Sequence, residues 1–126
     1  MKKEIFTPKA PKPLGPYSQA VLINNMLFVS GSIGIDDTGN LKSDIASQTK
    51  QCLSNIQHIL QEADFNLEDI VKTTIYLTHL ENFAVINAIY EEFFKNAPVK
   101  PARSTVEVSS LPKGALIEID VIAIKA

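Results

Sequence analysis

Two short runs of apolar residues near the start of the chain have the composition of β-strands and flank an asparagine pair. The runs contain SQAVLI and MLFVSG and cover about residues 18–23 and 26–32. Between them lie Asn24 and Asn25, which tolerate the positive φ angles of a tight turn. We therefore predict an antiparallel hairpin of two strands.

A proline-rich segment precedes this hairpin. Prolines and the residues before them avoid helical angles, so TPKAPKPLGP (7–16) is predicted to be extended. A short strand is expected before it, at about residues 4–7. After the hairpin, DDTGN (36–40) has the composition of a turn.

The apolar pattern changes to a helical period after this turn. From residue 45 to about residue 63, apolar residues recur every three or four positions on one face. Asp44 is a natural N-cap, because its carboxylate can accept hydrogen bonds from the free amides of the first turn. A second apolar stripe predicts a helix over about 82–95.

Three further strands complete the pattern. β-Branched residues predict one strand at 70–78 and another at about 103–109, and ALIEIDVIAIK (115–125) predicts the last. The order β-β-β-α-β-α-β-β is typical of an α+β protein with one sheet and two helices. A chain of 126 residues is long enough for one core, so we expect a single domain over 1–126.

The last strand has one wholly apolar face and a second face that is mostly apolar. The second face is interrupted only by Glu118 and Asp120. Two helices can cover one side of such a sheet, so the other side would remain in water as an adhesive patch. Another copy of the same chain is the simplest cover, and we predict a homo-oligomer.

Composition narrows the classes of partner. The formal net charge is −2, with no long run of one sign, so the sequence has no basic face for nucleic acid or for a membrane surface. No stretch approaches the roughly 18 apolar residues that cross a bilayer. The first residues lack the apolar core of a secretory signal, and the single cysteine, Cys52, excludes an intramolecular disulfide. We expect a cytoplasmic protein without nucleic-acid or membrane partners.

Arg103 is the only arginine among twelve basic residues and stands at the start of a predicted strand. If the last two strands form a hairpin through SSLPKGA (109–115), Arg103 and Glu118 lie near the same end of the sheet. Spacing alone favours a structural Arg–Glu ion pair. The alternative is a site in which the guanidinium grips a carboxylate by two hydrogen bonds, beside an acid that handles water or a proton.

Two other residues allow a structural and a functional interpretation. Asn87 lies between Phe83 and Tyr90 at helical spacing on an apolar face, and a buried amide satisfied by the backbone is the favoured interpretation. The alternative is an amide that orients a ligand. Tyr17 follows Gly15-Pro16, which fixes the direction of its ring; such a tyrosine is usually a packing residue, but it also suits a pocket wall.

VSGSIG (29–34) only superficially resembles a phosphate-binding loop. It fits neither glycine-rich nucleotide motif and no helix follows directly, so nucleotide binding is rejected. Ser30 and Gly31 could still let backbone amides approach a small ligand. The two histidines and Cys52 lack the spacing of metal ligands, and no metal site is expected.

Five separated motifs together resemble one known family, and the likeness covers essentially the whole chain. The motifs are GPYSQA, FVSGSIG, NAIYEEFF, PARSTVEV and LPKGALIEID. They are similar to the Rid family of reactive-intermediate (enamine/imine) deaminases, formerly called YjgF, and most of all to its RidA branch.

The resemblance implies a chorismate-mutase-like α+β fold with two helices on one face of a single sheet. It also implies a homotrimer whose sheets form an inner barrel, with sites between subunits. The implied reaction is hydrolysis of reactive 2-imino and enamino acids, of the 2-iminobutyrate and 2-aminoacrylate type, to 2-keto acids and ammonia without a cofactor. By motif, Arg103 would bind the substrate carboxylate and Glu118 would position or activate water. The implied substrate-binding residues are Tyr17, Ser30, Gly31, Asn87, Arg103 and Thr105.

Two positions depart from the family pattern. Thr105 stands where many RidA members have a cysteine, although its hydroxyl can still donate to a ligand, and Ser32 stands where glutamine is common.

Two other functions stay open. One is a trimeric module that binds small metabolites without catalysis. The other is a ribonuclease-type translation inhibitor, which the acidic balance disfavours.

Overall fold

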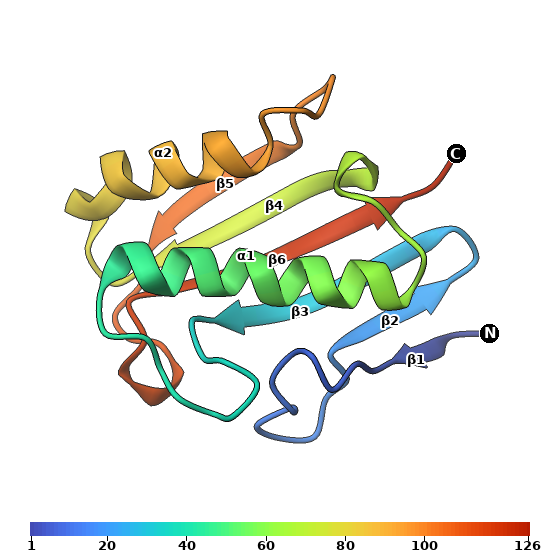
Figure 1. The fold of residues 1–126 in the computed structure, drawn as a ribbon, viewed down its shortest axis with the longest axis horizontal. Coiled ribbons are helices and arrows are strands. Elements are labelled where there is room, and N and C mark those ends of the chain that lie inside the picture. The colour runs from blue at the N-terminus through green and yellow to red at the C-terminus, as the bar shows by residue number, and fades with distance from the viewer.

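The structure, a computed structural model, describes residues 1–126, and its main elements follow the predicted order (Figure 1). The strands and helices are β1 (Lys3–Ile5), β2 (Ala20–Ile23), β3 (Met26–Ile33), α1 (Ile45–Glu62), β4 (Ile70–Leu77), α2 (Phe83–Phe93), β5 (Ala102–Glu107) and β6 (Ile117–Ile124). No helix is both long enough and apolar enough to span a membrane.

All six strands form one sheet in the order β1-β2-β3-β6-β4-β5. β6 lies between β3 and β4 and is antiparallel to both, whereas β5 pairs only with β4, in parallel. The last two strands therefore do not form the hairpin that the sequence left possible. β6 takes a central place because its apolar side chains, such as Ile117 and Ile119, become fully buried there. β5 is more polar and mostly exposed, which suits an edge.

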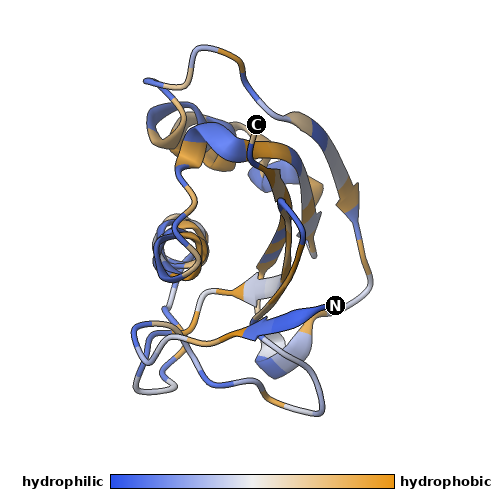
Figure 2. Cartoon of the chain, turned by 90° about the vertical axis from the view of Figure 1, so that its right-hand side faces the viewer, coloured by the Kyte–Doolittle hydropathy of each residue, from blue (hydrophilic) through white to orange (hydrophobic).

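Both helices lie on one side of the sheet, which Figure 2 shows nearly edge-on. The core fills this side, where α1 packs on β3 and β6 and contributes the buried Cys52 and Ile56. The predicted α+β fold, with one sheet and two helices on one face, is confirmed.

The second face of the sheet has no layer over it in the single chain. Phe28 and Ile122 are opposite each other in the β3–β6 pair, next to the pair Met26 and Ile124. Phe28 is 39% exposed and Ile124 is 36% exposed. The alternation predicted for the last strand is confirmed, while a second copy of the chain over this face stays a prediction.

Local structure follows the sequence at the predicted hairpin turn and at the predicted N-cap of α1. Asn24 has a φ of 52°, as the tight turn between β2 and β3 requires. The Asp44 carboxylate accepts a hydrogen bond from the Ser47 amide at 2.7 Å and caps α1.

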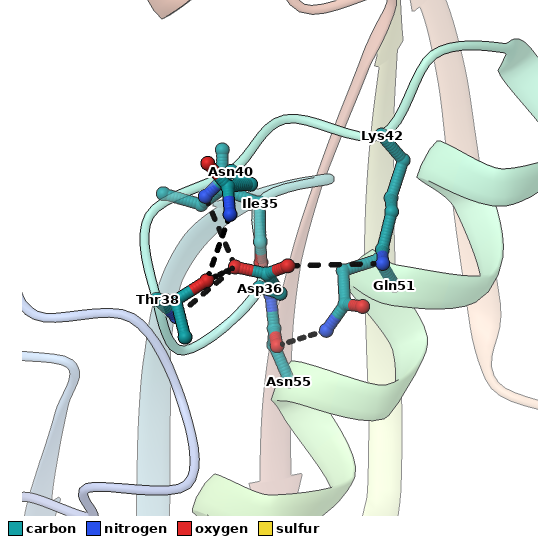
Figure 3. Close-up of polar contacts among 7 residues, drawn as sticks. All are labelled: Ile35, Asp36, Thr38, Asn40, Lys42, Gln51 and Asn55. Atoms are coloured by element: carbon teal, nitrogen blue, oxygen red, sulfur yellow. Dashed lines mark hydrogen bonds and ion pairs between the residues drawn. The ribbon is translucent and has the colours of Figure 1, made fainter.

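The turn between β3 and α1 is organised by Asp36 (Figure 3). Its Oδ1 accepts hydrogen bonds from the hydroxyl of Thr38 at 2.6 Å and from the amides of Thr38 and Asn40 at 3.0 Å, and Lys42 pairs with Oδ2. These contacts, the Thr38 hydroxyl most of all, lower the Asp36 pKa from 3.8 to about 2. Buried Asn55 on α1 ties down the same segment by donating to the Ile35 carbonyl at 2.9 Å.

The proline-rich segment is held by a buried glutamine just before β2. Gln19 accepts a hydrogen bond from the Thr7 amide at 2.8 Å and donates to the carbonyls of Thr7 and Pro11 at 3.0 and 2.9 Å. A segment without its own secondary structure thereby obtains partners for its backbone, and this places Tyr17 beside β3.

Candidate functional site

The residues proposed from the sequence fall into two groups on opposite faces of the sheet. Arg103 is paired with Thr73 on β4, and Glu118 is paired with Tyr76 on the same strand. Paired residues share a face, and residues three apart on one strand point to opposite faces. Arg103 therefore lies on the helix side and Glu118 on the open side.

No structural ion pair joins Arg103 to Glu118. The ion pairs of the chain are Lys42–Asp36 and Lys95–Glu92. The ion-pair interpretation is therefore wrong for the single chain. Its premise was the hairpin of the last two strands, which β4 prevents by lying between them.

Arg103 rests against two aromatic rings of α2. Its guanidinium carbon is 4.8 Å from the ring centroid of Tyr90 and 5.5 Å from that of Phe83. Such contacts are attractive through the negative face of each ring. The half-buried guanidinium makes no hydrogen bond to another protein group, so its donors are free for a ligand. The hollow beside it is lined by Asn87, Tyr90, Glu91, Phe94, Lys100 and Arg103.

Asn87 and Thr105 belong to the same side of the molecule as Arg103. Thr105 follows Arg103 by two residues on β5. It is half-buried and paired with Ile75 on β4. The Asn87 side-chain oxygen is buried without a hydrogen-bond partner. The favoured interpretation of Asn87 as an amide satisfied by the backbone is therefore wrong for this atom, because nothing within α2 or the sheet reaches it.

The second group centres on a bulge in β3. Val29 and Ser32 are paired with Val121 and Ile119, so Ser30 and Gly31 together oppose the single residue between these partners. A Cβ added to Gly31 would lie 2.6 Å from a carboxylate oxygen of Glu118. Glycine is thus needed where the Glu118 side chain crosses the bulge.

Glu118 is half-buried, and its surroundings favour the neutral acid. Burial raises the pKa of its carboxyl, and the nearby charge of Asp120 raises this pKa further. The Asp120 carboxylate itself accepts a hydrogen bond from the Tyr76 hydroxyl at 3.1 Å. A carboxyl whose pKa is raised in this way takes up a proton more readily than an ordinary glutamate.

Tyr17, Ser30 and Gly31 line one narrow cavity under the proline-rich segment. The Tyr17 hydroxyl accepts a hydrogen bond from the Leu14 amide at 3.0 Å, and its side chain remains exposed. The Ser30 hydroxyl donates to the Ser18 carbonyl at 2.6 Å. The structure thus brings these three residues together, and Glu118 adjoins them through Gly31.

The sequence interpretation missed the rings that contact Arg103. Phe83 and Tyr90 counted only as packing residues, although Phe83, Asn87 and Tyr90 have the i, i+4, i+7 spacing of one helix face. That spacing was the available signal. No group of three or more His, Cys, Asp or Glu side chains is arranged to hold a metal ion.

Comparison with known proteins gives the family. The profile of the family described as "Endoribonuclease L-PSP" matches residues 7–125. A RutC family protein from Pyrococcus abyssi is 53% identical over 98% of each chain. The structure of YyfA from Yersinia pestis, described as a member of the conserved Rid protein family, has a TM-score of 0.96 and 50% identity over 99% of this chain and 100% of that one. E. coli TdcF with bound serine has a TM-score of 0.95 and 38% identity over 98% and 99%.

These likenesses extend over the whole fold and both groups of candidate residues. The chain belongs to the Rid (YjgF) family, the family of the endoribonuclease L-PSP profile.

Proposed function

We propose that this protein hydrolyses reactive 2-imino and enamino acids, of the 2-iminobutyrate and 2-aminoacrylate type, to 2-keto acids and ammonia. One observation carries the proposal: the only arginine of the chain is half-buried, stacked on two rings and without a hydrogen-bonding partner. A guanidinium that is held in place with free donors is suited to bind a carboxylate through two parallel hydrogen bonds.

The site requires two copies of the chain. Arg103 and Glu118 lie on opposite faces of one sheet, so a substrate that meets both must lie between subunits. The open face, with Phe28 and Ile122, supplies an apolar surface for association. We propose a homotrimer in which Arg103 of one subunit faces the Glu118 group of its neighbour.

The chemistry follows from these two groups. Arg103 holds the substrate carboxylate, with Thr105 as a further donor beside it, and so orients the C=N bond. Glu118 accepts a proton from water as the water oxygen bonds to the imine carbon. The proton passes to nitrogen and gives a carbinolamine. Glu118 then takes the remaining hydroxyl proton and returns it to nitrogen as the C–N bond breaks, so ammonia leaves and the water oxygen becomes the keto oxygen. An imine is already electrophilic, so the proposed mechanism uses no cofactor.

The test is a coupled assay in which a dehydratase generates 2-iminobutyrate and keto-acid release is followed. We expect Arg103→Ala to lose most of the acceleration, while Lys50→Ala, which removes an exposed charge of the same sign, retains it. Full hydrolysis by the Arg103→Ala variant would sink the proposal.

The serine bound to E. coli TdcF supports binding of amino-acid-like carboxylates as a second candidate function. A trimer that binds such ligands without accelerating imine decay would be a binding module. The family description names an endoribonuclease, but a net charge of −2 gives RNA little electrostatic attraction. RNA cleavage that is lost with a site substitution would favour that activity instead.

A further inference from the structure

The face of α2 that meets Arg103 carries three residues with different chemistry. Phe83, Asn87 and Tyr90 lie at i, i+4 and i+7, so they share one face of the helix. Both outer residues contact the guanidinium through their rings, at 5.5 and 4.8 Å from the ring centroids. Asn87 therefore lies between the two ring-bearing residues on this face of the helix.

Two complementary polar groups in this region lack partners. The Asn87 oxygen is a buried acceptor without a donor, and Arg103 is a five-donor group without an acceptor. A buried carbonyl oxygen left unpaired is costly, and such atoms are rare in folded proteins. Asn87 and Arg103 line the same hollow, so the unpaired acceptor and the unpaired donors face one shared space.

A hydrogen bond to the sheet holds the Tyr90 ring in place. Its hydroxyl is hydrogen-bonded to the hydroxyl of Thr73, a fully buried residue. Thr73 is also the strand partner of Arg103. The ring is therefore tied to the same pair of strands that carries the arginine, and this limits how far the guanidinium can tilt.

The other charged residues of the hollow do not replace Asn87. The Lys100 ammonium donates to the carbonyls of Phe94 and Ala97 at 2.7 and 3.2 Å and is occupied at the end of α2. Glu91 is exposed and forms no ion pair with Arg103. Asn87 is thus the buried neutral acceptor available to the guanidinium.

We propose that Phe83, Asn87 and Tyr90 form a cradle that positions Arg103 for a carboxylate. The rings set the plane of the guanidinium, and the Asn87 oxygen accepts one N–H while two others bind the ligand. This inference rests on the proposed function, since it assumes that Arg103 binds the substrate carboxylate. The positioning residues are then Phe83, Asn87 and Tyr90. Only the planar guanidinium of an arginine can stack on both rings, donate to Asn87 and still bind the carboxylate.

The test measures KM and kcat for 2-iminobutyrate, and binding of 2-oxobutanoate by calorimetry. Asn87→Leu, which keeps the size of the side chain but removes the acceptor, should raise KM about tenfold with little change in kcat, because a hydrogen bond to a charged group is lost. Phe83→Leu, at a partly exposed ring, should raise KM a few-fold, roughly the worth of one cation–π contact. Phe93→Leu is the control, because this ring packs on Phe94 at the end of α2 and is not one of the two rings that contact Arg103.

Two further variants separate positioning from a structural role. In an Arg103→Lys background, Asn87→Leu should have no additional effect on KM, because a lysine cannot bridge the carboxylate and the asparagine. Asn87→Asp should raise KM more than Asn87→Leu does, because the new carboxylate competes with the ligand for Arg103. Equal effects of Asn87→Leu in both backgrounds would overturn the cradle.

The outcomes also distinguish the cradle from the proposed function. If Arg103→Ala hydrolyses imines as the wild type does, the proposed function fails. If Arg103→Ala loses activity and binding while Asn87→Leu, Asn87→Asp and Phe83→Leu keep wild-type KM and affinity, only the cradle fails.

Discussion

The Gly31 α-carbon and the Glu118 carboxylate approach so closely that an added Cβ would lie 2.6 Å from the carboxylate oxygen and 2.7 Å from its carbon. Glu118 is flexible at its end, so a larger residue at position 31 displaces the carboxylate and leaves the backbone in place. The β3 bulge therefore fixes where the proposed proton acceptor lies.

Gly31→Ala is expected to lower kcat by about a hundredfold, the usual contribution of a positioned acid–base group. Circular dichroism and the melting temperature should change little. Gly15→Ala is the control, since its added Cβ would meet the Tyr17 ring at an ordinary 3.8 Å. Full activity of Gly31→Ala would remove Glu118 from the mechanism.

Mixing two inactive variants tests the shared site. Arg103→Ala and Glu118→Gln should each be inactive alone. If one subunit supplies Arg103 and its neighbour supplies Glu118, mixed oligomers contain some sites with both residues and regain part of the activity. The measurement is keto-acid release after joint unfolding and refolding. No recovery, despite mixed oligomers detected by native mass spectrometry, would place both residues in one subunit's site or outside the site.

Association through the open face is tested at Ile122, the strand partner of Phe28. Ile122→Glu places a charge on this surface and should shift the protein toward monomers, because burying an unpaired carboxylate is costly. Light scattering gives the mass. Glu4→Gln, a change at the exposed edge strand β1, should leave the mass unchanged. An unaltered oligomer for Ile122→Glu would show that subunits associate through another surface.

The dependence of kcat/KM on pH should reflect the titration of Glu118. Burial, and then the charge of Asp120, raise its pKa, so the reactive carboxylate form is lost at a higher pH than for an ordinary glutamate. As pH falls through this raised pKa, kcat/KM should fall as well. Asp120→Asn removes the neighbouring charge and should move this acid limb to lower pH. If the acid limb of the Asp120→Asn variant stays at the wild-type pH, a group other than Glu118 causes that limb.

Asp36 should make stability depend on pH in the acidic range. Its pKa is lowered from 3.8 to about 2 in the folded chain, so its contribution is complete above about pH 4 and is lost as pH falls toward 2. Asp36→Asn should lower the melting temperature at neutral pH, with a difference from the wild type that shrinks in this window. Asp37→Asn, at an exposed neighbour without hydrogen bonds, is the control. A difference that persists at pH 2 would contradict the role of the charge.

Local features of the chain were readable from the sequence. Asp44 caps α1 and Asn24 adopts a positive φ, because both depend on side chains within a few residues. The alternation along β6 also gave its buried and open faces correctly, since neighbouring side chains of any strand point to opposite sides.

The partners of the strands were not readable in this way. The alternation of β5 and β6 is compatible with a hairpin, yet β4 lies between them. Strand order results from competition among all strands for the central positions, where burial is greatest. The orphan acceptor of Asn87 was hidden for the same reason, because whether an amide finds a partner depends on elements distant in the chain.

The sequence by itself determined the order of elements, the faces of each strand and the family, because periodicity, caps and motifs are properties of neighbouring residues. Only the tertiary structure decided that Arg103 lies against α2 on one face and Glu118 over Gly31 on the other. The physical reason is that β6 pairs with β4 and buries one apolar face there, which separates two residues that a local hairpin would have joined.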